Sequence, residues 1–314
     1  MKLVRNRILL AKLESTPGSD SNPVVGSNAV ETKSPIVINW NANVLNRDNI
    51  RGNISAMPPV IGQRWAEINF QVELRGSGSV GVAGQLSALL QACAMSEAVS
   101  AGSSVVYLPT SPNQSTITMY IYDLDSGSCV LNKFVGCVGD WSWGGKAGEL
   151  SYLDFKFKGL ILSTADAALP SSPTYETTVA PVVQSASFSI KSIGTLIVQQ
   201  LSISLGNNIG SRDDINSSAG LKGFFVTNRA PKASLNPEEN TVAEWDKLAD
   251  WAASTQMALS VQIGSTAGNI CTITAPKAVL DSIKDADKNG IAAHELALSL
   301  GLSSGNDEIK LKFT

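Results

Sequence analysis

The sequence has few of the groups that carry out acid–base, nucleophilic or metal chemistry. It contains one histidine, His294, and a single histidine cannot on its own supply a Ser-His-Asp arrangement. Its four cysteines lack the C-x-x-C spacing of zinc and redox sites; they are Cys93, Cys129, Cys137 and Cys271. We therefore expect no enzyme activity, no catalytic residues, no metal and no cofactor, and we expect reduced thiols in a reducing compartment.

Charge is also scarce. Charged residues make up only 16% of the chain, and the formal net charge is −3. A protein that holds nucleic acid by neutralising phosphates needs a basic surplus, so this class is excluded. No apolar run approaches the roughly 20 residues of a membrane span, and the run at residues 8–11 is too short for a signal peptide. We expect a soluble protein, without membrane insertion, that is made in a cytoplasm.

Hydrophobic residues account for 43% of the 314 positions, enough to form the cores of two domains of ordinary size. Residues 15–35 are rich in Ser, Pro, Gly and Asn, which predicts an arm with little core of its own. A second stretch rich in Pro, Ser, Thr and Ala predicts an extended linker. The predicted divisions are an N-terminal assembly arm (1–35), a first β domain (36–165), a linker (166–184) and a second β domain (185–314).

An internal repeat is the most informative pattern that is present. Arg47-Asp48-Asn49-Ile50 follows an alternating run at 36–45, and Arg212-Asp213-Asp214-Ile215 follows another at 196–205. Lys146-x-Gly148 and Lys288-x-Gly290 also match, each ahead of a closing strand. Each copy reads as an irregular excursion (46–64 and 206–220), a strand (65–74 and 221–228), one helix and further strands. The fold class predicted is mainly β with α: two tandem β-sandwich or barrel domains, each with one flanking helix.

Both helices have an apolar stripe. The first presents Leu86, Leu89, Leu90 and Cys93 at spacings of three and four. The second is expected to open at a capping box formed by Thr241 and Glu244. It is expected to present a set of apolar side chains to the core: Val242, Trp245, Leu248, Ala249 and Ala252.

The strand at 65–74 alternates cleanly. Its apolar side is predicted to be buried, and its polar side is predicted to meet water or a polar neighbour. The polar positions are Glu67, Asn69, Gln71 and Glu73.

Three motifs suggest ligand sites but are better explained by structure. The segment 285–290 has the alternating oxygen ligands of a calcium loop, but Leu296 stands where the bidentate carboxylate belongs, so a turn is favoured. The glycines at 76, 78 and 81 lack the βαβ context of a dinucleotide site, which favours a flexible loop. Trp141 and Trp143 could stack on a sugar, although a core or interface position is favoured.

The repeated Arg-Asp pair differs from these motifs because it occurs at equivalent places. We predict that Arg47, Asp48, Arg51, Arg212 and Asp213 make contacts between subunits of an assembly.

The order of several segments resembles the tail tube (major tail) proteins of long-tailed bacteriophages. The segments are residues 9–18 (LLAKLESTPG), Pro58-Pro59 after the first Arg-Asp, residues 70–78 (FQVELRGSG), the helix at 86–93 and residues 167–171 (AALPS). The resemblance covers about residues 1–185, and the second unit joins it through the repeat. It departs from the family in carrying two units, where one is common.

The resemblance implies a structural virion protein that polymerises into stacked rings, whose strands line a hollow tube for DNA. Two units per chain favour a trimer with pseudo-six-fold symmetry over a hexamer. The implied partners are copies of the same chain and the tape-measure, tail-terminator and baseplate proteins, and the implied locations are the phage tail and, during assembly, the host cytoplasm. The polar strand positions, Glu67, Asn69, Gln71 and Glu73, would face the lumen. A β-sandwich module that binds carbohydrate or protein is the alternative, and an enzyme using the 285–290 turn with His294 is a second.

Overall fold

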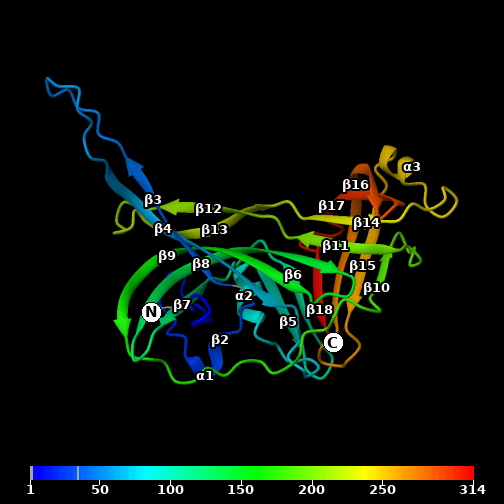
Figure 1. Cartoon of the computed structure of the whole chain (residues 1–314), viewed down its shortest axis with the longest axis horizontal. Helices are drawn as coiled ribbons and strands as arrows, with labels where there is room; N and C mark the ends of the chain where they lie inside the picture. Colours follow the sequence, from blue (N-terminus) through cyan, green and yellow to red (C-terminus); the bar gives the residue numbers. More distant parts are fainter. Residues whose placement is uncertain (1–2, 34) are drawn as a thin grey trace.

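The computed structural model describes residues 3–33 and 35–314, and these residues form a mainly β protein (Figure 1). The strands of the first half are β1 (Arg7–Leu13), β2 (Ala29–Val30), β3 (Val37–Leu45), β4 (Val60–Glu73), β5 (Met95–Ser100), β6 (Ser104–Pro109), β7 (Ile117–Leu124), β8 (Cys129–Lys146) and β9 (Tyr152–Ala167). Those of the second half are β10 (Ser187–Ile190), β11 (Val198–Ser204), β12 (Asn207–Asp213), β13 (Leu221–Arg229), β14 (Lys232–Pro237), β15 (Met257–Ile263), β16 (Cys271–Lys288), β17 (Ile291–Gly301) and β18 (Lys310–Phe313). The helices are short: α1 (Val25–Asn28), α2 (Ser87–Ala92) and α3 (Lys247–Ala252). In the part of the chain described, no helix has the length and apolar character needed to cross a membrane.

The two halves have the same strand order. In the first, the pairings run β1-β7-β8-β9-β4-β3, all antiparallel. In the second, they run β10-β15-β16-β17-β14-β11, also antiparallel. A short helix also occupies the same place in the sequence of each unit. α2 lies between β4 and β7, and α3 lies between β14 and β15. The internal repeat seen in the sequence is thus a repeat of topology, with one helix flanking each unit.

The two units share one sheet and one core. The end of β8 pairs with β11, and β18 at the C-terminus pairs with β6 of the first unit. One cluster of buried apolar side chains runs through both units. Asp166 and Ala167 of the predicted linker end β9, and the rest, 168–184, is extended with an isolated bridge between Leu150 and Val182. The boundaries of the four predicted divisions stay predictions, because the shared sheet and core do not separate the units.

Large aromatic side chains fill the core of the first unit. Phe70, Phe155 and Phe157 come from neighbouring strands, and their ring centroids lie 5.7–5.8 Å apart. Trp141 and Trp143 on β8 are fully buried beside them, and their indole N–H groups donate to Met95 Sδ at 3.1 Å and Ser151 Oγ at 2.8 Å. Each indole nitrogen has an internal partner, as a buried tryptophan needs.

The N-terminal segment contributes more core than predicted. β1 lies between β2 and β7 in the sheet, and Leu9 and Leu10 are buried. The segment predicted as an assembly arm, 1–35, therefore includes a core strand at residues 7–13, ahead of the stretch 15–35 from which the low core content was predicted. The apolar run at 8–11 has the length of a short buried strand, and the Ser/Pro/Gly-rich stretch after it conceals this.

The second helix begins later than predicted. Thr241 and Glu244 exchange the two bonds of a capping box, Thr241 N–H to Glu244 Oε2 at 3.1 Å and Glu244 N–H to Thr241 Oγ1 at 3.3 Å. They close a turn, however, and α3 starts at Lys247 with Asp246 accepting from the Ala249 N–H as its N-cap. Only Trp245 of the predicted apolar set is buried; the others, Val242, Leu248, Ala249 and Ala252, are exposed.

One strand prediction is wrong in a similar way. The excursion predicted at 206–220 contains β12, whose Asn, Gly and Ser residues have low strand propensity but are held by pairing with β13. In the same unit β16 runs unbroken through Pro276, which a register shift opposite Met257 and Leu259 accommodates.

Asp250 holds α3 against β10. It accepts from Lys191 Nζ at 2.8 and 2.7 Å and from Trp245 Nε1 at 2.8 Å. Burial raises the pKa of this carboxyl, but the bonds from Lys191, Trp245 and Thr255 outweigh burial, and the pKa is lowered. The ionised form is therefore favoured by folding.

We predict a pH-dependent loss of stability that Asp250→Asn removes. A lowered folded pKa stabilises the protein above the unfolded value of about 4, and this contribution is lost as the pH falls through the folded value. At pH 7 the variant should be less stable by about 1–2 kcal/mol, since Lys191 is partly exposed to solvent. Between pH 5 and 3 it should lose less stability than the parent in urea titrations. Asp166→Asn, at an exposed position, is the control. If the free energy of unfolding fell in parallel with pH for all three proteins, ionised Asp250 would not be the source of the pH dependence.

Candidate assembly surfaces

The polar side of β4 and β9 forms one continuous ladder of half-exposed side chains. Glu67 lies 3.5 Å from Lys158 Nζ, Asn69 is opposite Lys156, and Gln71 donates to Asp154 at 2.5 Å. The fourth position, Glu73, is 3.3 Å from Arg75. The four residues predicted to face the lumen therefore lie together on one sheet face. Both charged members have a cationic partner, Lys158 on β9 for Glu67 and Arg75 just after β4 for Glu73.

The second unit continues this face. The rows of the two units correspond: Val37, Asn69, Lys156 and Asp140 lie side by side across β3, β4, β9 and β8. Ser202, Ser234, Ala297 and Ser282 lie side by side across β11, β14, β17 and β16. Because β8 pairs with β11, the two faces join into one face of eight neighbouring strands, β3-β4-β9-β8-β11-β14-β17-β16, within the larger sheet.

The two Arg-Asp segments occupy equivalent places on two projecting hairpins. Arg47 and Asp48 begin the exposed loop between β3 and β4, and Arg212 and Asp213 end β12 beside β13. The β3–β4 hairpin reaches far from the body of the molecule, with the β12–β13 hairpin near its base (Figure 1). Gln63 Nε2 donates to the Gly220 carbonyl at 3.2 Å, so the hairpins touch. The structure leaves Arg47, Asp48, Arg51, Arg212 and Asp213 exposed and on separate hairpins.

The loop at 46–59 also exposes apolar groups. Ile50 and Ile54 are fully exposed near its tip. Ile215 holds the corresponding place in the second hairpin and is fully exposed as well. Fully exposed isoleucines on a projecting loop are typical of a surface that another chain covers.

β3 and the end of β16 are open strand edges. Among the described residues β3 pairs only with β4, and residues 282–288 of β16 pair only with β17. β3 has no charged residue, and Trp40 on it is 51% exposed. Proteins protect such edges with charges, bulges or covering segments, because an uncharged edge pairs readily with another strand.

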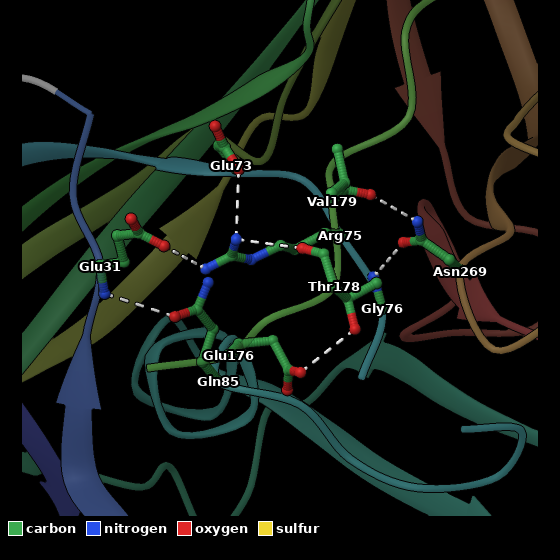
Figure 2. Close-up of polar contacts among 9 residues, drawn as sticks. All are labelled: Glu31, Glu73, Arg75, Gly76, Gln85, Glu176, Thr178, Val179 and Asn269. Carbon is green, nitrogen blue, oxygen red and sulfur yellow. Dashed lines mark hydrogen bonds and ion pairs between the residues drawn. The ribbon is translucent and has the colours of Figure 1, made fainter. Parts of the chain in front are cut away.

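A buried arginine lies just past the other end of β4, where the N-terminal segment and the linker meet (Figure 2). Arg75 is 6% exposed, and it donates to Glu31 at 2.7 Å, to Glu73 at 3.3 Å and to the Thr178 carbonyl of the linker at 3.1 Å. Beside it, Asn269 of the second unit accepts from the Gly76 N–H at 2.8 Å. The arginine therefore joins the N-terminal segment to the linker, and its neighbour Gly76 joins β4 to the second unit.

The glycine-rich segment after β4 is close-packed against the second unit, and the predicted flexible loop is wrong. The Gly78 N–H donates to the Gly268 carbonyl at 3.1 Å. A Cβ on Gly76 would lie 2.1 Å from that carbonyl oxygen, so only glycine fits. Neither this contact nor the Arg75 network was predicted from the sequence, since the bonds to Glu31, Thr178 and Asn269 join residues 44, 103 and 193 positions apart.

The remaining motifs have structural roles. Residues 285–290 end β16 in a two-residue hairpin turn, with Asn289 and Gly290 at positive φ, as the favoured interpretation requires. His294 lies on β17, 3.6 Å from Asp285. Trp141 and Trp143 are in the core, so they cannot form the platform that the carbohydrate-binding alternative needs.

A polar sheet face, open strand edges and projecting hairpins with exposed isoleucines are typical of a structural protein that assembles with other chains. The model of the phage tail tube protein family matches residues 5–309, and the chain belongs to that family. No curated protein matches this sequence. The family makes the chain a component of a phage tail, with a structural role.

We predict that Arg75→Met lowers stability by about 2–4 kcal/mol, because Glu31, Glu73 and the Thr178 carbonyl lose a buried cationic partner. Urea unfolding would measure this. Arg64→Met on the same strand is the matched control, since Arg64 is exposed. Equal midpoints for the two variants would show that the network adds nothing.

Proposed function

We propose that this chain is the repeating subunit of a phage tail tube. Copies join side by side into rings, the rings stack, and the sheet faces enclose a bore through which DNA passes into the host. The observation that supports this most is the eight-stranded sheet, which is polar on one face and open at both edges.

The polar face suits a bore that carries DNA. On the ladder of β4 and β9, the two carboxylates of Glu67 and Asp154 balance the two cations of Lys158 and Lys156, so this part of the face has little net charge. A conduit whose lysines were free would bind phosphates along its whole length and slow transit. We place Glu67, Asn69, Gln71 and Glu73 on the lumen wall.

The projecting hairpins suit contacts between stacked rings. The loop at 46–59 and the turn at 214–220 carry the Arg-Asp segments and the exposed isoleucines. In this proposal Arg47, Asp48, Arg51, Arg212 and Asp213 contact the next ring, together with the polar part of the N-terminal segment.

Two units of one topology in each chain favour a ring of three chains with pseudo-six-fold symmetry. Tape-measure, tail-terminator and baseplate proteins would contact the ends or bore of the tube. Assembly would take place in the host cytoplasm.

Electron microscopy of the purified protein tests the function. Hollow tubes with a regular axial repeat are expected, and image classification would give the symmetry of the ring. A protein that stays monomeric at high concentration, with or without tail-end partners, would overturn the proposal.

We predict that Ile50→Ser combined with Ile54→Ser shortens or abolishes tubes without changing the thermal midpoint of the monomer. Both side chains are fully exposed, so their loss costs the isolated fold less than about 0.5 kcal/mol. Val179→Ser, at an exposed linker position, is the control and should leave tube length unchanged. Normal tubes from the double variant would remove this loop from the stacking contact.

We predict that Asn69→Lys makes the tubes bind duplex DNA at low salt. Each ring would gain unpaired positive charges on the wall, and binding should weaken steeply as salt rises. Ser171→Lys on the exposed linker adds the same charge away from the sheet face. Equal retention of DNA by the two variants in a filter-binding assay would place Asn69 outside the bore.

A further inference from the structure

The chain contains one complete joint between consecutive units. Residues 142–146 of β8 pair antiparallel with residues 200–204 of β11. The joint is extended at both ends, because the Leu205 N–H donates to the Trp141 carbonyl at 3.1 Å and the Ala147 N–H to the Gln199 carbonyl at 2.9 Å. It uses the side of β8 that β7 leaves vacant beyond Cys137.

The repeat assigns each partner of this joint an equivalent in the other unit. The end of β8 corresponds to the end of β16 with a shift of 142 positions (288 minus 146), since Lys146-x-Gly148 matches Lys288-x-Gly290. The β11–β12 segment corresponds to β3 with a shift of 165 (212 minus 47). The two rows of paired residues across the strands, described above, agree with both shifts. Asp140 and Ser282 hold the same place in their rows, 142 positions apart, and Val37 and Ser202 do so 165 positions apart.

These equivalents are the two open edges. β15 pairs with β16 only as far as Ala278, and the Asp281 carbonyl is taken by Trp251 Nε1 at 3.2 Å. From Ser282 to Lys288 the strand has β17 on one side and no strand on the other, among the residues described. β3 lacks a neighbour on the side away from β4.

On the basis of the proposed function, we propose that the end of β16 in one copy pairs with β3 of the next copy, in the register of the internal joint. Within the chain Gly144 is opposite Ser202. The equivalent of Gly144 is Ala286 (144 plus 142) and the equivalent of Ser202 is Val37 (202 minus 165), so Ala286 lies opposite Val37. Asp285 then lies opposite Ile38, and Asp287 lies opposite Ile36. The occupant of the β3 edge is a second copy of this chain.

The charges around the β3 edge suit this occupant. A hollow of about 470 Å³ lies beside it, lined by Val4, Arg7, Ile36, Trp40, Asp123 and Val130 among others. Arg7 pairs with Asp123 at 2.5 Å and also donates to the Ile36 carbonyl. Asp287 of the incoming strand would arrive opposite Ile36, whose carbonyl Arg7 contacts, and its neighbour Lys288 would arrive beside Pro35.

The joint is directional. One copy offers the β16 end and the next offers β3, so a growing series keeps one unpaired edge at each end until it closes. A heterologous contact of this kind gives a closed ring when the rotation per copy divides a full turn. The internal joint makes the same rotation between units, which is how one geometry serves every position around the ring.

Cysteine cross-linking tests the register. Val37 and Ala286 would form a non-hydrogen-bonded pair, in which the N–H and C=O groups of the two residues point away from each other. This arrangement brings the Cβ atoms of an antiparallel pair closest. The double variant Val37→Cys/Ala286→Cys, oxidised after assembly, should give covalent chains of two and three copies on a denaturing gel. An equal mixture of the two single variants should give only dimers. Burial raises the pKa of the native Cys93, Cys137 and Cys271 thiols, so they should contribute little background.

Two controls calibrate the experiment. Gly144→Cys/Ser202→Cys spans the internal joint and should close within one chain. Asn41→Cys/Ala286→Cys is displaced by four residues along β3, about 13 Å, and should not cross-link. Normal tubes with only monomers on the gel, or equal cross-linking by the displaced pair, would overturn this joint while leaving the tube function intact. A parent chain that forms no tubes would overturn the function itself.

Discussion

The structure depends on the requirement that backbone N–H and C=O groups at strand edges find partners. Within the chain most strands meet this by pairing on both sides, including across the units at β8 with β11 and at β18 with β6. Among the described residues, the strands that pair on one side only are the short β2, β5 and β10, the two strands of the β12–β13 hairpin, and the edges that carry the proposed joint, β3 and the end of β16. An uncharged, half-apolar edge is unsafe in an isolated protein, so the fold implies an environment in which the edge is covered. Self-assembly supplies that environment, and the tail tube family supplies the reason for it.

The contacts between the units are what allow an assembly to have a defined shape. Arg75, Glu31 and the linker at Thr178 lock one end of the first unit, and Gly76 and Gly268 bring the two backbones into direct contact. Contacts of this closeness allow little sliding or rotation. A fixed angle between the units of each chain would therefore be passed on to every ring that the chains build.

Local patterns in the sequence were sufficient to predict much of the fold. The alternation at 65–74, the hairpin turn at 289–290 and the equivalence of the two Arg-Asp segments all have counterparts in the structure. The failures were of a different kind. β12 exists because β13 pairs with it. α3 starts at Lys247, after the N-cap Asp246, because Asp250 and Trp245 anchor that turn, and Arg75 is buried by segments far away in sequence. Tertiary contacts override local propensity at each of these places, and a single sequence does not display them.

The linker at 166–184 has a consequence for the speed of assembly. It keeps β8 and β11 on one molecule, so their joint closes at a high effective concentration and does not wait for collisions between chains. A chain of two tethered units therefore enters assembly with half of its lateral joints already formed. Joining the two units in one chain thus replaces a slow encounter between two molecules with the fast closure of a loop.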